Sequence, residues 1–180
     1  MIVAKDKIKT NIGEYLLYMF QIEDIIRACS FDKNIIEEKI VSQYNVSDNT
    51  KKEIKEWYFG LTDMMINEKI EKNGHLQFLI NRINEIYDFH LFLMQNNDFK
   101  DYQNKFNAVY PIINELKTKQ KSAINDIDVI LNAIYGVYIL KLQKKTITPE
   151  TLDSTAKISS VLADLSKKFH DYEKGGINFE

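Results

Sequence analysis

The chain has 180 residues, of which 44% are hydrophobic and 28% charged, and its formal net charge is -2. This composition suits one soluble globular domain, excludes a disordered chain, and gives no support to nucleic-acid binding, which usually needs a basic surface. Glycine (6) and proline (2) are scarce, which argues against the turn-rich chain of an all-β fold and favours long helices.

Cellular location is indicated by three features of the sequence. Lys5, Asp6 and Lys7 follow the first residues directly, so no secretory signal peptide is expected. The longest apolar run, residues 15–20, is too short to cross a membrane. The single cysteine, Cys29, permits no internal disulfide and reads as a small buried hydrophobe. The sequence therefore predicts a cytoplasmic protein with no membrane partner.

Three helices are predicted in the first part of the chain. Apolar residues recur at spacings of three and four from residue 5 to 29, and they cover the helix nearly all round, which is typical of a buried helix. A second helix should follow Asp32, a good N-cap. Thr50 and Glu53 have the spacing of a capping box and predict the start of a third helix, ending near residue 72 before Asn-Gly.

The second part of the chain predicts three or four more helices. One should run from 75 to 95, and the next begins after an N-cap at Asp98. Pro111 should kink or divide this helix because proline removes an amide donor. Another helix should follow Ser122. Thr148-Pro149 is a strong start signal for the last, with threonine as N-cap and proline in the first turn.

These elements predict an all-α fold: a single-domain bundle of six to seven mostly antiparallel helices. The connecting loops are short, and short loops place neighbouring helices antiparallel. The bundle should occupy residues 1–175, and Gly175-Gly176 should end the last helix before a flexible C-terminal tail, 176–180.

Five segments carry a resemblance to known sequences: residues 13–28, 56–58, 72–77, 132–136 and 140–145. Through them the whole chain resembles a family of uncharacterised bacterial proteins, mostly from Bacteroidetes, that have a similar length. Phe20 stands where the family has tryptophan, which keeps an aromatic ring. The family has no assigned function. The resemblance therefore implies a bacterial intracellular protein and supplies no catalytic residue.

A polar line on the first helix is the first candidate site. Glu14, Tyr18 and Gln21 share one face by their spacing, and Asp24 lies beside them. Carboxylates on a mostly apolar helix are costly to bury unless they are paired. The line is therefore either part of a ligand site in the bundle core or a strip that faces water or forms salt bridges.

His90 lies on the apolar stripe of its helix and is the histidine of most interest. It is either a hydrogen-bonded core residue or a ligand or base. His75 is expected in the first turn of the same helix, and His170 near the exposed C-terminus. No Glu-x-x-His pair or His-Glu-x-x-His motif is present, so the sequence predicts no metal and no cofactor.

Trp57, Tyr58 and Phe59 form an aromatic run within one helix. Three consecutive helical residues point in different directions, so they cannot all face one core. At least one should contact a further helix, a ligand or a second subunit. The sequence shows no phosphate-binding loop, nucleophile elbow or dinucleotide-binding motif.

Two hypotheses of function remain, and a third is disfavoured. The first is a non-enzymatic interaction or assembly module, either as a homo-oligomer such as a homodimer or with a protein partner. The second is a small-molecule or metal-binding bundle, either a binding protein or an enzyme, with its polar site on the helices that carry Glu14 and His90. Nucleic-acid binding is not expected, because the lysine clusters that end two successive helices should lie at opposite ends of the bundle; they comprise Lys117, Lys119, Lys121, Lys141, Lys144 and Lys145.

Overall fold

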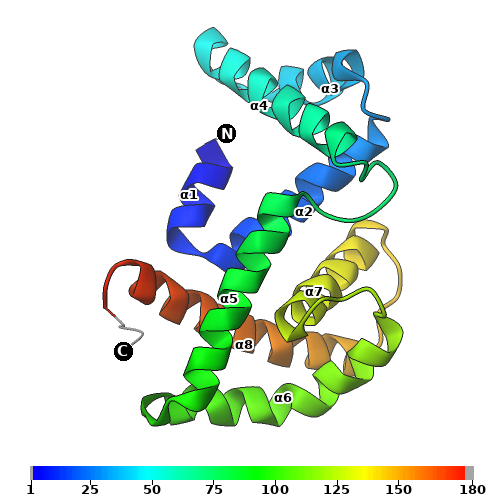
Figure 1. Ribbon diagram of the computed structural model, residues 1–180. Coiled ribbons are helices and arrows are strands. Elements are labelled where there is room, and N and C mark those ends of the chain that lie inside the picture. The colour runs from blue at the N-terminus through cyan, green and yellow to red at the C-terminus, as the bar shows by residue number, and fades with distance from the viewer. Residues whose placement is uncertain (1, 177–180) are drawn as a thin grey trace.

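The computed structural model describes residues 2–176, which form eight α-helices and two short 3-10 helices, with no strand within this range (Figure 1). The predicted all-helical fold is confirmed, and the predicted number of six to seven helices is wrong by a small margin. Of the predicted C-terminal tail, residues 177–180 lie outside the described residues.

The extra helix comes from a break in the first predicted one. The segment 5–29 falls in two helices, α1 (Ile2–Thr10) and α2 (Ile12–Ala28), which meet at an angle (Figure 1). Asn11 between them has an extended backbone, and its side-chain oxygen accepts the N–H of Glu14 at 3.1 Å. This N-cap starts a new helix in a new direction. The apolar periodicity continues across the break, which is why the sequence pattern does not reveal it.

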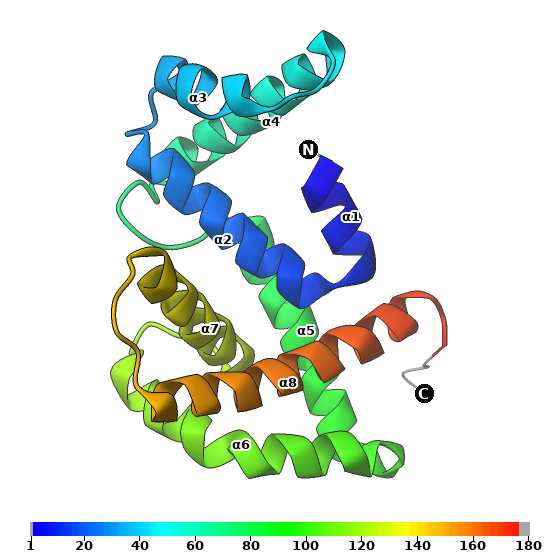
Figure 2. The ribbon, with the colours of Figure 1, turned by 180° about the vertical axis from the view of Figure 1, so that it is seen from behind.

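A hairpin of two helices packs on the C-terminal part of α2 (Figure 2). It consists of α3 (Lys33–Lys39), a 3-10 turn (Val41–Gln43) and α4 (Asp48–Asn67). The predicted cap at Asp32 is confirmed, since its carboxylate accepts two backbone N–H groups.

Both ends of α4 differ from the prediction. Its N-cap is Ser47, whose hydroxyl accepts the N–H of Thr50, so the predicted capping box of Thr50 and Glu53 is wrong. A serine three residues earlier offers the same chemistry and extends the helix by a turn. The helix ends at Asn67 instead of near residue 72, because Lys69 adopts a left-handed backbone with φ of 58°.

The remaining helices form the other end of the molecule. In chain order they are α5 (Gln77–Gln95), a 3-10 turn (Asn97–Phe99), α6 (Lys100–Lys119), α7 (Asp126–Leu142) and α8 (Pro149–Glu173). Helices α6, α7 and α8 contact one another, and α7 and α8 also contact α2. Helix α5 crosses α8 steeply in both views, so the helices do not all share one axis (Figures 1 and 2).

Of the two proline signals in this half, one correctly predicts the start of a helix and the other does not divide its helix. Thr148 caps α8 and Pro149 is its first residue, as predicted. Pro111 does not divide its helix, because α6 continues through it from Lys100 to Lys119.

Helix α5 begins at Gln77 and not at His75, so residues 68–76 form an irregular segment between α4 and α5. This segment carries His75 and is central to the site described below.

The core is continuous, and α2 connects its two ends by contacts with α1, α4, α7 and α8. Each fully buried large apolar side chain contributes about 1.5 to 3 kcal/mol to folding. Gly13 of α2 brings that helix close to α8, since a Cβ there would lie 2.7 Å from the hydroxyl of Ser166. The largest fully buried apolar and aromatic side chains include Leu16, Met19, Phe20, Ile22, Ile26, Ile36, Tyr58, Met65, Leu79, Phe89 and Tyr102.

Candidate functional site

The predicted polar line of α2 lies along a groove between α2 and α7. Glu14, Tyr18 and Gln21 line this groove opposite Tyr135 and Tyr138. The groove has a volume of about 260 Å³, so it is small for a ligand pocket. Three of the predicted residues thus lie on one surface, as their spacing predicts.

These groove residues are largely satisfied by other residues of the chain. Glu14 is exposed and lies 2.5 Å from the ammonium of Lys7. Burial raises the pKa of Tyr18, and the neighbouring Tyr44 adds to the effect. Asp24, one turn further on, accepts the hydroxyl of Tyr135 at 2.7 Å. The line therefore has the hydrogen bonds and ion pairs expected of a structural strip.

His90 does not lie on this groove. It is buried in α5, its Nδ1 lies 2.6 Å from the hydroxyl of Tyr102, and its ring packs against Phe106. Burial lowers the pKa of His90 to about 4, although nearby Asp126 offsets part of the effect. The geometry is that of a neutral, hydrogen-bonded core histidine.

The aromatic run of α4 is divided between core and surface. Tyr58 is buried, whereas Trp57 and Phe59 are half-buried. The Phe59 ring has the ammonium groups of Lys33 and Lys55 each 5.4 Å from its centroid. Trp57 packs edge-on against Tyr58 and keeps part of its ring at the surface.

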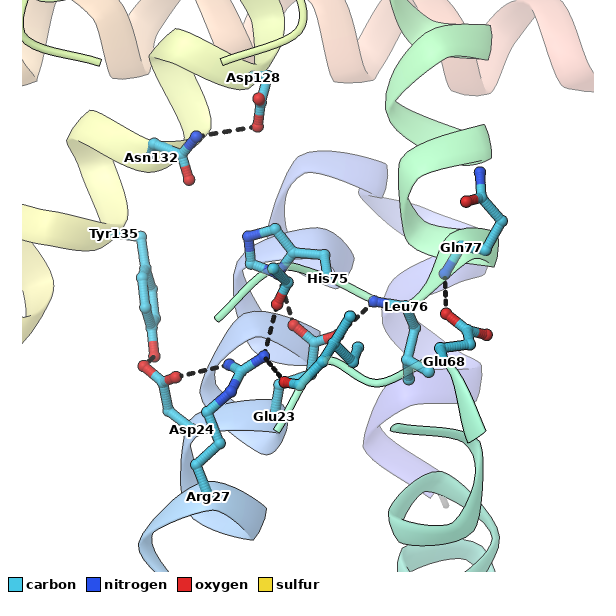
Figure 3. A network of polar contacts seen from close by, with 12 residues as sticks. Glu23, Asp24, Arg27, Glu68, His75, Leu76, Gln77, Asp128, Asn132 and Tyr135 are labelled. Carbon is cyan, nitrogen blue, oxygen red and sulfur yellow. Dashed lines mark hydrogen bonds and ion pairs between the residues drawn. The ribbon is translucent and has the colours of Figure 1, made fainter. Parts of the chain in front are cut away.

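A different pair of residues, Glu23 and His75, forms the most unusual polar centre of the molecule (Figure 3). The side chain of Glu23 is 0% exposed, because Glu23 lies among the core residues of α2. Its Oε2 is 2.5 Å from Nδ1 of His75, and its Oε1 accepts the N–H of Leu76 at 2.8 Å. A buried carboxylate is tolerated only when such partners satisfy it.

His75 is held in place by its surroundings. Its ring stacks on Phe20 with a centroid distance of 3.7 Å and an interplanar angle of 17°. Tyr135 of α7 meets the same Phe20 ring edge-on. The Glu23 hydrogen bond fixes one ring nitrogen and the Phe20 stack fixes the ring plane, so the second nitrogen, Nε2, has a defined direction.

Arg27 fastens the segment that carries His75 to α2. Its Nη2 donates to the carbonyl oxygens of Ile70 and Gly74, at 3.2 and 2.5 Å. Its Nη1 donates to Asp24 at 2.9 Å. One guanidinium thus joins both sides of the irregular segment to the helix behind it, which keeps the His75 backbone in one position.

The wall opposite His75 is formed by the first turns of α7. The Asp128 carboxylate accepts the backbone N–H of Ile124 at 3.0 Å and the side-chain amide N–H of Asn132 at 2.9 Å. In Figure 3 the His75 ring points from its segment toward α7, and the amide oxygen of Asn132 lies on the side that faces His75.

Between these two walls lies an open cavity of about 590 Å³. This volume is within the range of small-molecule sites. Its lining combines polar residues with three isoleucines: Asn73, Gly74, His75, Ile80, Ile83, Lys119, Gln120, Ser122, Ile124, Asp128 and Asn132.

The Glu23–His75 pair determines what the cavity can do chemically. A carboxylate only accepts hydrogen bonds, so the shared proton of a neutral ring lies on Nδ1. Nε2 then carries a lone pair, and no hydrogen bond to it is formed by residues 2–176. The site can therefore accept a hydrogen bond from a ligand.

The Glu23–His75 pair is not predicted by the sequence, in which the two residues are 52 positions apart. The sequence pattern favours Asp24 and His90 instead and predicts a helical turn at His75. One signal was available: Glu23 lies between Ile22 and Ile26 on the most apolar helix face. A carboxylate in that position needs a partner from elsewhere in the fold.

Other kinds of site receive no support from the described residues. Within residues 2–176 no three His, Cys, Asp or Glu side chains gather to hold a metal ion. None of the helices in that range combines the length and apolar character needed to cross a bilayer. Burial raises the pKa of the Cys29 thiol, which makes it a weak nucleophile.

Comparison with known proteins agrees with the family resemblance. No curated protein matches the chain, and no solved structure matches it. One family model matches residues 1–176, and its description is "Domain of unknown function (DUF4924)". A match over nearly the whole chain shows that this protein belongs to that family.

Proposed function

We propose that this protein binds a small molecule in the cavity between His75 and the first turns of α7. The observation that carries the proposal is the direction of His75: Glu23, which is fully buried, orients the ring so that its unpaired Nε2 belongs to the cavity wall. A carboxylate bonded to one ring nitrogen sets the tautomer and the direction of the other nitrogen, an arrangement common among histidines that bind ligands or metals.

The rest of the site supports this function. Phe20 and Arg27 hold the His75 segment from behind, and Asp128 fixes the amide of Asn132 in front. Preorganised polar groups at the edge of an apolar surface are typical of small-molecule sites. Ile80 and Ile83 of α5 provide that apolar surface.

The test is a ligand screen that reports on the site itself. Mixtures of metabolites are added to ¹⁵N-labelled protein, and the signals of the Leu76 amide and the Asn132 side chain are followed. His75→Asn is the informative variant, because its amide nitrogen can replace Nδ1 toward Glu23 while Nε2 is lost. His170→Asn is the matched control, since His170 does not line the cavity.

The proposal expects a compound that shifts both signals in the wild type and in His170→Asn, but not in His75→Asn. A compound that shifts them equally in all three proteins binds without His75 and contradicts the proposed role. If no compound shifts either signal, the cavity is a structural feature and the proposal fails.

A second function, self-association through α4, is supported by a different observation. Trp57, Gly60 and Met64 are spaced by three and four residues, and each is at least partly exposed. A Cβ at Gly60 would meet no atom within 4 Å, so a second helix could approach closely there. We infer a homodimer in which this stripe packs on its copy.

Sedimentation velocity tests the dimer. The wild type should sediment as a dimer, and Trp57→Glu as a monomer, because a carboxylate would be buried in the interface. Leu142→Glu is the control, since Leu142 is 59% exposed on another helix and its variant should stay dimeric. A monomeric wild type overturns this second function and leaves the cavity proposal unaffected.

Location and partners complete the proposal. We place the protein in the cytoplasm, supported by its single cysteine, which is buried and unpaired as in reducing compartments. The proposal includes no nucleic-acid partner. Lys117 pairs with Asp126 and Lys119 with Glu115, so part of the predicted lysine cluster is neutralised within the fold.

A further inference from the structure

Building on the proposed binding function, we propose that the cavity recognises a small primary amine in its ammonium form. The inference comes from which hydrogen-bonding groups of the cavity are already used and which are not. A ligand has to supply the complement of the unused groups, because buried polar groups without partners are costly.

Three donors of the cavity lining are already engaged. Nδ1 of His75 is taken by Glu23, and the Asn132 amide nitrogen donates to Asp128 at 2.9 Å. The Gln120 amide nitrogen donates to the carbonyl of Val129 at 3.4 Å. Each bond also fixes the orientation of its amide or ring, since the partner can only accept.

Three acceptors of the same residues have no hydrogen-bond partner within the described part of the chain. Oε1 of Gln120 is buried without a hydrogen-bond partner. Nε2 of His75 and Oδ1 of Asn132 also receive no hydrogen bond from residues 2–176. All three residues line the same cavity. An ammonium group presents three N–H donors on one atom, which matches three acceptors.

The charges around the cavity favour a cation over a neutral donor. Asp128 is only 6% exposed and lies on the wall, and Glu23 lies behind His75. The cationic groups nearby are already paired, because Lys119 binds Glu115 and Arg27 binds Asp24. A carboxylate or phosphate ligand would face acceptors and negative charge, so anions are disfavoured.

The apolar residues of the lining indicate what kind of group the ammonium is attached to. Ile80, Ile83 and Ile124 lie beside the polar groups, so a short hydrocarbon chain attached to the ammonium would contact them. The expected ligand class is a small aliphatic amine, and not a polyol or an amino acid with an unmatched carboxylate.

Three probes of equal chain length separate these classes: n-butylamine, n-butanol and butyrate. Each is titrated at neutral pH into ¹⁵N-labelled full-length protein, and the Asn132 and Gln120 side-chain amides are followed. Butylamine should shift both signals with saturation, and the other two probes should not. Gln120→Met should weaken butylamine binding about tenfold, because it removes one acceptor of a charged donor. Gln143→Met, at an exposed position, should bind as the wild type does.

The outcomes distinguish this inference from the proposed function. Saturating shifts by butanol or butyrate but not by butylamine overturn the amine assignment and leave a binding cavity in place. Equal affinity of Gln120→Met and Gln143→Met also overturns it, since the acceptor would then play no part. If none of the probes shifts the amides while the metabolite screen finds a His75-dependent ligand, the amine assignment fails alone. If the screen also finds none, both fail.

Discussion

Oε2 of Glu23 lies 2.5 Å from Nδ1 of His75, and the buried carboxylate thereby determines which nitrogen of the ring faces the cavity. The two residues come from α2 and from the segment before α5, so the pair forms only in the folded chain. Its consequence is chemical as well as structural, because the tautomer of His75 decides whether the cavity offers an acceptor or a donor.

Glu23→Gln should reverse this tautomer. The glutamine oxygen can still accept the Leu76 N–H, whereas its amide nitrogen would donate to Nδ1 of His75 and leave the proton on Nε2. The ¹⁵N shifts of the imidazole nitrogens report the change directly. Ligands that donate to Nε2 should bind at least about tenfold more weakly, which is the effect expected from one lost hydrogen bond.

Glu14→Gln is the control for this experiment, because Glu14 is an exposed carboxylate on the same helix. It should leave the His75 ring signals unchanged. If Glu23→Gln also leaves them unchanged, the carboxylate does not set the tautomer, and the proposed role of His75 as an acceptor in the cavity is contradicted.

Arg27→Lys should loosen the segment that carries His75. A lysine reaches one carbonyl at most in a defined geometry, whereas Arg27 donates to Ile70 and Gly74 together. We expect a loss of about 1 to 3 kcal/mol in the free energy of unfolding. Hydrogen exchange of the Leu76 amide should accelerate. Arg82→Lys, which alters pairs with Glu85 and Glu173 instead, should not accelerate that amide; equal acceleration in both variants would contradict the anchoring role.

The sequence predicted the fold class and the faces of the helices better than it predicted the site. The spacing of Glu14, Tyr18 and Gln21 placed them on one surface, and the structure agrees. Periodicity reports which direction a side chain points but not which distant residue it meets. That is why His90 was grouped with this line, although its partners are Tyr102 and Phe106 on α6.

The Glu23–His75 pair was beyond these methods for a related reason. Local signals suggested that His75 begins a helix, whereas tertiary contacts from Glu23 and Arg27 hold it in an irregular segment. Capping chemistry was likewise ambiguous where two suitable residues lie close together, as with Ser47 and Thr50. Where a local sequence signal is ambiguous, tertiary packing determines where the helix begins and which residue caps it.

Two helical glycines should respond oppositely to alanine. A Cβ at Gly13 would lie 2.7 Å from the Ser166 hydroxyl and 3.0 Å from a Leu162 carbon, whereas at Gly136 it would meet no atom within 4 Å. Gly13→Ala should lower the free energy of unfolding by about 1 to 3 kcal/mol through overpacking. Gly136→Ala should raise it by up to about 1 kcal/mol through helix propensity.

Urea denaturation of both glycine variants against the wild type measures the difference. The sign matters more than the size: a stabilised Gly13→Ala would show that α2 and α8 can separate without cost. A destabilised Gly136→Ala would show that the open surface at this position is covered, for instance by a second subunit.

Stability should fall in mild acid because of His90. Burial lowers its pKa to about 4 in the folded protein, whereas the unfolded value is about 6.5. Below pH 6.5 the unfolded chain therefore binds a proton that the folded chain excludes, so the unfolded state is favoured as the pH falls toward 4. Between pH 7 and pH 4.5 this single group should cost about 2 kcal/mol.

His90→Gln isolates that contribution. Glutamine can still form a hydrogen bond to Tyr102 but does not titrate, so the variant should lose less stability than the wild type over the same pH interval, by about 2 kcal/mol. Urea unfolding at the two pH values gives this difference, and the carboxylates that titrate in the same range largely cancel in the comparison. Identical pH dependence in the two proteins would mean that His90 takes up its proton within the fold, and that the core around Phe106 admits a charge.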